Sequence, residues 1–253
     1  MTSKIFKFKV KNFDFEKTFK QGLFYFFYQK EPKRKVFWEK KLVDLSFWQK
    51  GEVLFMEVQG KVKNEKKLLQ RIEYCFGLKE DMTRFYKLCQ KDKFLKKILS
   101  WIKNTRIISG FSDFEAIVGA VVSQRNSYKN YRLQMEKIYQ KTFFIKEKFK
   151  KKILSPLKLG YKLKYLLSLK EKFKKDMKED ELLSLPGIGK YSLELFLVFQ
   201  KRDWRRFYVD CLTEKIMGEC YGIKKDFEKS AKKLWGNFRG IVLLYLQRFF
   251  EKK

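Results

Sequence analysis

Histidine is absent from this chain of 253 residues, and its absence excludes several kinds of catalytic site. Without imidazole there is no Ser-His-Asp triad, no Cys-His nucleophile and no histidine-liganded zinc. The four cysteines, Cys75, Cys89, Cys211 and Cys220, lie far apart, and no pair has the spacing of metal ligands. Acid–base chemistry must therefore come from Asp, Glu, Lys, Tyr or Cys side chains.

Long apolar segments are also absent. No run of 18 or more apolar residues occurs, and the first seven residues lack the apolar core of a signal peptide. We therefore expect a cytoplasmic protein with no membrane partner, in which the cysteines stay reduced.

Acidic residues are few beside basic ones, with 29 Asp and Glu against 60 Lys and Arg and a net charge of +31. A nucleic acid is the natural partner for such an excess. An AT-rich genome would also enrich lysine and phenylalanine together, and both are abundant here, so charge alone leaves this alternative open. The hydrophobic content of 45% is enough for a substantial core.

The first sixty residues are typical of β-strands, because apolar and polar residues alternate and turn residues separate the runs. After Gly60 the apolar residues recur with helical spacing. We predict an α+β fold that is mostly helical, with an N-terminal antiparallel sheet domain at residues 1–62 and a helical core at residues 63–253. About five strands are expected, at Ile5–Val10, Leu23–Tyr28, Val36–Trp38, Leu42–Trp48 and Val53–Val58.

Two helices have informative ends or faces. Ser112 followed by Glu115 predicts an N-cap with a capping box. At the other end of the chain, one apolar stripe predicts a last helix that runs continuously through Trp235, Phe238, Val242, Tyr245 and Phe249.

One of only three prolines lies in the segment Leu185–Lys190, which reads Leu-Pro-Gly-Ile-Gly-Lys between two predicted helices. Two glycines at this spacing allow a tight turn that presents backbone N–H groups at a helix start, where a phosphate can bind. Taken alone, the same pattern also fits an ordinary corner between two helices.

The segment Leu185–Ser192, followed 21 residues after Gly189 by Asp210, resembles the motif of helix-hairpin-helix DNA glycosylases. Further resemblance to the 3-methyladenine glycosylase II and 8-oxoguanine glycosylase branches extends over nearly the whole chain. It is carried by Phe13–Gly22, by Phe114–Val118 with Ser123–Ser127, and by Leu159–Tyr165. The resemblance implies a glycosylase core with two helical subdomains flanking an active-site cleft.

The resemblance makes Asp210 the catalytic carboxylate. Cleavage of an N-glycosidic bond builds positive charge on the sugar, and a carboxylate stabilises that charge without any histidine. Asp210 also fits a helix N-cap, and the two roles are compatible. The resemblance places Gln124, Arg125 and Asn126 on the loop that fills the gap left by a flipped base. Arg125 is the favoured plug, and a plain surface loop is the alternative.

Tyr191 stands where lyase-competent members of the family carry a lysine, and Lys190 occupies the preceding position. This departure implies a monofunctional enzyme. The C-terminal four-cysteine cluster that the endonuclease III branch often carries is also missing, so no iron–sulfur cluster is implied. Tyr191 is expected to line the base pocket with Gly22, although core packing is an equal alternative for a tyrosine on an apolar helix. Trp38, Trp48, Trp101 and Trp235 are further candidates for the pocket.

The sequence therefore predicts a monomeric, monofunctional DNA glycosylase that acts on double-stranded DNA containing a damaged purine, alkylated purines first. Removal of 8-oxoguanine is the first alternative, favoured by Gln21-Gly22 and Leu159–Tyr161. Excision of mismatched uracil or thymine and a non-enzymatic hairpin DNA-binding protein are the others. No cofactor is implied beyond a monovalent cation at the hairpin carbonyls. The expected DNA contacts are Leu185, Pro186, Gly187, Ile188, Gly189, Lys190, Gln124, Arg125 and Asn126.

Overall fold

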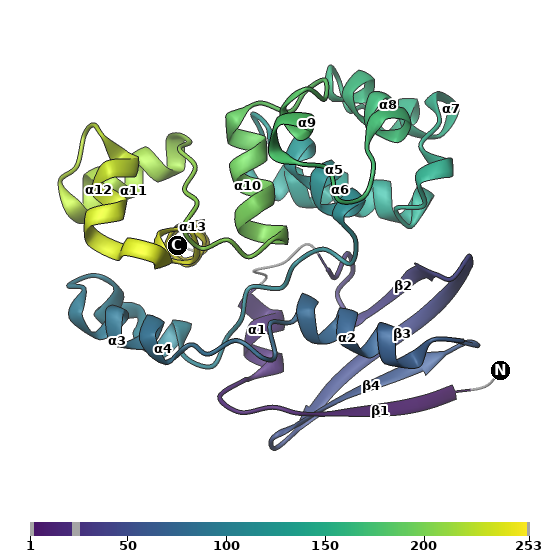
Figure 1. Cartoon of the computed structure of the whole chain (residues 1–253), viewed down its shortest axis with the longest axis horizontal. Coiled ribbons are helices and arrows are strands. Elements are labelled where there is room, and N and C mark those ends of the chain that lie inside the picture. Colours follow the sequence, from purple (N-terminus) through teal and green to yellow (C-terminus); the bar gives the residue numbers. More distant parts are fainter. Residues whose placement is uncertain (1–2, 22–25, 252–253) are drawn as a thin grey trace.

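The N-terminal part of the chain forms an antiparallel sheet, seen at the lower right of Figure 1. The computed structural model describes residues 3–21 and 26–251. Within these residues, the strand order is β1-β4-β3-β2. Alternation along each strand follows the pleat, so that Val43, Leu45 and Phe47 of β3 are buried. The strands are β1 (Ser3–Lys9), β2 (Lys33–Trp38), β3 (Lys41–Lys50) and β4 (Val53–Gln59).

Two helices cover the apolar face of the sheet (Figure 1). They are α1 (Phe15–Gln21) and α2 (Glu65–Cys75), and their buried side chains share one hydrophobic cluster with the strands. Asp14 begins α1 by accepting a hydrogen bond from the backbone of Lys17 at 2.8 Å. The predicted domain boundary at residue 62 stays a prediction. Helix α2 follows this boundary in the chain, yet its buried side chains belong to the same hydrophobic cluster as the sheet.

The strand predicted at Leu23–Tyr28 is wrong for the part that the structure describes. Phe26, Phe27 and Tyr28 have irregular backbone, and their rings are buried under the sheet and α2 or against α6. Their side chains pack in the core, but their backbone forms no strand of the sheet. The Phe26 carbonyl instead accepts a hydrogen bond from the Arg34 side chain at 2.7 Å. Residues 23–25 and Gly22 lie outside the described residues.

The rest of the chain is helical and has its own hydrophobic cluster. Helix α5 lies at its centre, and every residue from Phe114 to Val122 is buried. The predicted fold class, mostly helical with an N-terminal antiparallel sheet, is confirmed. The helices are α3 (Thr83–Lys91), α4 (Leu99–Ile102), α5 (Asp113–Ser123), α6 (Tyr128–Thr142), α7 (Lys151–Leu154), α8 (Lys162–Lys172), α9 (Glu179–Leu183), α10 (Lys190–Gln200), α11 (Cys211–Tyr221), α12 (Phe227–Trp235) and α13 (Arg239–Glu251).

The helices after α4 form two groups in Figure 1. Helices α5 to α10 lie above the sheet, and α11 to α13 lie to the left of α10. The predicted continuous last helix is wrong, because Trp235 ends α12 and Gly236 adopts a positive φ of 53° before α13 begins. None of the described helices is long and apolar enough to cross a membrane.

A buried ion pair connects the sheet to α5. Arg34 on β2 donates to both carboxylate oxygens of Glu115, at 3.0 and 2.9 Å, and both side chains are 1% exposed. The Arg34 guanidinium also lies 4.6 Å from the ring centre of Phe26. Ser112 is the predicted N-cap of α5, accepting from the Glu115 backbone at 3.1 Å, whereas the Glu115 carboxylate is engaged by Arg34.

We expect Arg34→Met to lower the free energy of unfolding by about 3–5 kcal/mol, because the substitution leaves the Glu115 carboxylate buried without its partner. Urea denaturation measures this loss. The double variant Arg34→Met/Glu115→Leu should be more stable than Arg34→Met alone, since it buries no unpaired charge. A loss below about 1 kcal/mol for the single variant would contradict the assignment.

Candidate active site

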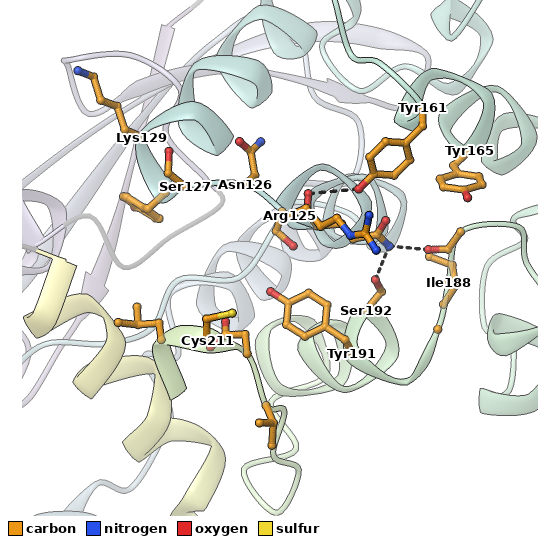
Figure 2. Close-up of a pocket in the computed structure, with 18 of the residues that line it drawn as sticks. Arg125, Asn126, Ser127, Lys129, Tyr161, Tyr165, Ile188, Tyr191, Ser192 and Cys211 are labelled. Carbon is orange, nitrogen blue, oxygen red and sulfur yellow. Dashed lines mark hydrogen bonds between the residues drawn. The ribbon is translucent and has the colours of Figure 1, made fainter. Parts of the chain in front are cut away.

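A cleft with a volume of about 1370 Å³, called the outer cleft here, opens between the end of α5, the hairpin before α10 and the start of α11. Figure 2 shows Tyr191 and Ser192 of α10 facing the loop that carries Arg125 and Asn126, with Tyr161 and Tyr165 beside the hairpin. A smaller cavity of about 120 Å³, the inner pocket, adjoins it and shares Tyr191 and Asp210 with it.

The hairpin between α9 and α10 is anchored by its apolar residues, since Leu185 and Ile188 are buried. Gly187 adopts a φ of +85°, and a Cβ at this position would lie 2.6 Å from Cδ2 of Tyr165. Gly187 is therefore required both for its backbone conformation and for the close approach of Tyr165.

Gly189 has a different reason to be glycine. Its φ of −105° suits any residue, and apart from its two chain neighbours no described residue has an atom within 4 Å of where its Cβ would be. It precedes α10, and the N–H groups of Gly189, Lys190 and Tyr191 donate to no residue among those described. The open space and free donors together form a site at which an anion can approach the backbone. The Lys190 side chain is 80% exposed and lies 3.7 Å from Glu228.

The loop after α5 carries Gln124, Arg125 and Asn126, and of these only Arg125 makes no side-chain hydrogen bond or ion pair with the described residues. Gln124 Nε2 donates to the Gly187 carbonyl at 2.6 Å and to Ser192 Oγ at 2.7 Å, so this amide fastens the loop to the hairpin (Figure 2). Asn126 Nδ2 donates to Gln134 Oε1 at 2.9 Å. Arg125 is exposed, has a φ of +46°, and makes no ion pair or hydrogen bond with the described residues. A left-handed arginine at a cleft is the kind of strained backbone that functional sites retain.

Asp210 is the N-cap of α11, as predicted. Its Oδ1 accepts from the backbone N of Thr213 at 2.7 Å and from Thr213 Oγ1 at 2.8 Å. Gln247 Nε2 donates to Oδ1 at 3.1 Å and to Oδ2 at 3.2 Å. Oδ2 therefore has one donor in the described chain and keeps acceptor capacity. The N-terminal end of α11 favours the negative charge of this carboxylate.

A hydrogen-bond chain through α13 orients Asp210. Tyr208 donates to Gln247 Oε1 at 2.6 Å, which directs the amide nitrogen of Gln247 to the carboxylate. The ring of Tyr208 in turn meets Tyr191 edge to face, with ring centres 5.5 Å apart. Sequence reasoning missed Gln247 because it follows Asp210 by 37 residues and belongs to no motif.

Tyr191 lines both cavities together with Asp210, and its contact with a base stays a prediction. Burial raises the pKa of its hydroxyl to about 12, and the charge of Asp210 adds to the increase. Tyr191 is consequently a neutral phenol near pH 7, which can stack or donate a hydrogen bond but is a poor nucleophile.

The four tryptophans considered for the pocket lie elsewhere. Trp48 stacks on Phe55, Trp38 packs on Phe111 near the sheet, and Trp235 is buried in the helical core. Trp101 packs on Tyr245 and Phe249. The aromatic lining consists instead of Tyr128, Tyr131, Tyr191, Tyr208 and Phe199.

The described residues contain no group of three metal-ligating side chains. The four cysteines are free, and Cys211 is exposed. Three hairpin carbonyls are engaged within the chain, because Leu185 O accepts from Ile188 N, Gly187 O from Gln124 and Gly189 O from Leu193 N. Binding of a monovalent cation there stays a prediction.

The chain shares its fold with solved DNA glycosylase structures over nearly its whole length. It is 19% identical to a 3-methyladenine DNA-glycosylase from Archaeoglobus fulgidus, with a TM-score of 0.82, covering 97% of this chain and 99% of that one. It is 18% identical to an 8-oxoguanine glycosylase/lyase from Clostridium acetobutylicum in complex with double-stranded DNA, with a TM-score of 0.74 and 98% of both chains covered. No protein-family model matches the sequence, and comparison with curated protein sequences finds no significant match.

The two hairpin glycines should respond differently to alanine. We expect Gly187→Ala to lower the free energy of unfolding by more than about 1 kcal/mol, because the φ is positive and Tyr165 must move. Gly189→Ala, the matched control, should cost less than about 0.5 kcal/mol, since its φ is ordinary and its surroundings are open. Equal losses in urea denaturation would show that the hairpin geometry described here is wrong.

Proposed function

We propose that this chain is a monofunctional DNA glycosylase that hydrolyses the N-glycosidic bond of a damaged purine in double-stranded DNA and leaves an abasic site. The observation that carries the proposal is the Asp210 carboxylate, fixed by Thr213 and Gln247 beside an aromatic pocket. The likeness in fold to two glycosylases supports the same reaction class.

The free N–H groups at the start of α10 suit a DNA phosphate, and they recognise backbone without regard to sequence. The net charge of +31 adds a general attraction for DNA. Arg125, which lines the outer cleft, is the side chain that we assign to fill the gap in the stack when a nucleotide rotates out. Gln124 and Asn126 hold that loop in position through bonds within the protein.

The inner pocket accepts the flipped base between tyrosine rings. An alkylated purine carries positive charge, and an electron-rich ring such as Tyr191 attracts it by stacking and cation–π interaction. We therefore place alkylated purines first, in keeping with the 3-methyladenine activity named for the Archaeoglobus protein. The 8-oxoguanine activity named for the Clostridium protein is the second candidate.

Asp210 performs the chemical step in this proposal. As the bond from the sugar to the base breaks, positive charge grows on the sugar ring, and the ionised carboxylate stabilises it. Oδ2, which has one donor, is the oxygen available to orient the attacking water and accept its proton. A protein that only binds DNA would not need a carboxylate held in this way.

The absence of lyase activity follows from the side chain at position 191. A lyase needs an amine that attacks the sugar, and Tyr191 offers a neutral phenol. The adjacent Lys190 is exposed and paired with Glu228. In the described chain the inner pocket is lined by no lysine, and Lys129 lines only the outer cleft.

Asp210→Asn should lower the single-turnover rate of base release by about a hundredfold or more while DNA binding persists, because asparagine still caps α11 but carries no charge. Release is measured from a duplex with one damaged purine, and binding by fluorescence anisotropy. Release at the parent rate would show that Asp210 is not the catalytic carboxylate.

Borohydride should trap no covalent protein–DNA adduct during turnover, since no lysine of the described residues lines the inner pocket. The released product should be an uncut strand that breaks only on treatment with alkali. A trapped adduct, mapped to its lysine by peptide mass spectrometry, would overturn the monofunctional assignment.

A further inference from the structure

The inner pocket contains a second carboxyl group besides Asp210. Glu251 lies in the last turn of α13 and, like Asp210, lines both the outer cleft and the inner pocket. Arg248 Nη1 donates to Glu251 Oε2 at 3.3 Å, and the Glu251 side chain is 24% exposed. Oε1 has no hydrogen-bond partner among the residues that the structure describes.

The polar groups near Glu251 come from several elements. Arg248 stands one turn earlier on α13, Asp210 precedes α11, and Tyr191 comes from α10; Tyr128, Lys129 and Cys211 line the neighbouring walls. Burial raises the pKa of Glu251 above its ordinary value, Arg248 opposes the increase, and the charge of Asp210 adds to it. A base entering the pocket excludes more water and so further favours the protonated carboxyl.

Other groups in the pocket are poorly suited to supply a proton. Asp210 must stay ionised to stabilise the sugar cation, and its Oδ1 already accepts three hydrogen bonds. The pKa of Tyr191 is raised to about 12, and an arginine does not lose its proton in proteins. The Arg248 guanidinium is also held, 4.2 Å from the ring centre of Tyr128 and bonded through Nε to the Gln21 carbonyl at 2.6 Å.

We propose that Glu251 is the general acid for neutral bases, donating its proton to a ring nitrogen of the base as the glycosidic bond breaks. This inference rests on the proposed glycosylase function and extends its substrates from cationic alkylated purines to neutral damaged purines. The two carboxyl groups then have different roles: ionised Asp210 stabilises the positive charge on the sugar, and protonated Glu251 donates a proton to the base.

The step balances without any external reagent. The bond between the sugar C1′ and the base nitrogen breaks, and its electron pair leaves with the base. The proton of Glu251 neutralises that developing negative charge, so the base departs as a neutral molecule. Water adds to C1′ and gives a proton to Asp210, and exchange with solvent restores both carboxyl groups. A purine alkylated at N7 already carries the positive charge that makes it a good leaving group, so it needs no such proton.

The test compares Glu251→Gln with the parent on two duplexes, one containing neutral hypoxanthine and one containing cationic 7-methylguanine. Single-turnover release of hypoxanthine should fall about a hundredfold or more, the usual range for loss of a general acid. Release of 7-methylguanine should fall less than about fivefold. Glu251→Asp should restore part of the hypoxanthine activity. Glu219→Gln is the matched control, because Glu219 is exposed on α11 and, among the described residues, forms an ion pair with Lys215 alone.

The pH profile supplies an independent readout. With the parent, hypoxanthine release should decline as pH rises through the pKa of Glu251, since the proton is then lost. Release of 7-methylguanine should lack this decline, and Glu251→Gln should remove it from the hypoxanthine profile.

Three outcomes would overturn the inference. Equal losses on both duplexes in Glu251→Gln would assign Glu251 a structural role, and an unchanged rate on hypoxanthine would exclude it as the acid. A parent protein that releases cationic but no neutral bases would also refute it. Failure of the parent to release any base would instead refute the proposed function itself.

Discussion

A buried ion pair between Arg34 and Glu115 joins the sheet to the helix on which the candidate site depends. Both charges are removed from water, and several partners offset that cost. The two hydrogen bonds between Arg34 and Glu115 are well formed, Tyr28 also donates to Glu115 at 2.8 Å, and Phe26 contributes a ring and a carbonyl to Arg34. Glu115 stands in the first turn of α5, and the other end of this helix carries the loop with Arg125. The ion pair therefore links the sheet, through α5, to the loop that forms one wall of the outer cleft.

The opposite wall is organised around Asp210. Thr213 and Gln247 give the carboxylate a fixed orientation, and Tyr208 fixes the amide of Gln247 in turn. Helix α13 therefore contributes to the site although its residues follow Asp210 at a distance along the chain. Between the walls, Gln124 bonds to Gly187 and Ser192, which fixes the proposed phosphate site relative to the proposed base pocket. The proposed reaction on a flipped base requires this rigidity, because the proposed contact with the DNA backbone sets the position of the sugar.

The parts of the site that a local pattern encodes could be predicted from the sequence. The hairpin glycines, the N-cap at Asp210 and the place of Tyr191 depend on neighbours within a few residues or on a fixed spacing, and the structure brings them together. The proposed DNA contacts of Leu185, Pro186, Gly187, Ile188, Gly189 and Lys190, and the pocket role of Gly22, stay predictions.

Features that depend on long-range packing were not predictable in the same way. The segment Phe26–Tyr28 has strand-like composition, yet its rings are buried in the core and its backbone does not pair with the sheet. The position of Glu115 fits a capping box, but its carboxylate accepts hydrogen bonds from Arg34, which lies 81 residues away in the chain. Gly236 ends a helix whose apolar stripe continues past it. Gln247, Arg248 and Glu251 carry no local signal, because only the return of α13 to the pocket gives them a role.

The central claim is that a carboxylate and an aromatic pocket make this fold an enzyme that removes bases. The most direct measurement incubates the parent protein with a set of duplexes, each containing one lesion: a 3-methyladenine analogue, hypoxanthine, 8-oxoguanine, or a uracil or thymine mismatch. The account predicts release of at least one damaged purine, with the strand left intact until it is treated with alkali. Tight binding to every duplex without release of any base would contradict it and leave a DNA-binding protein.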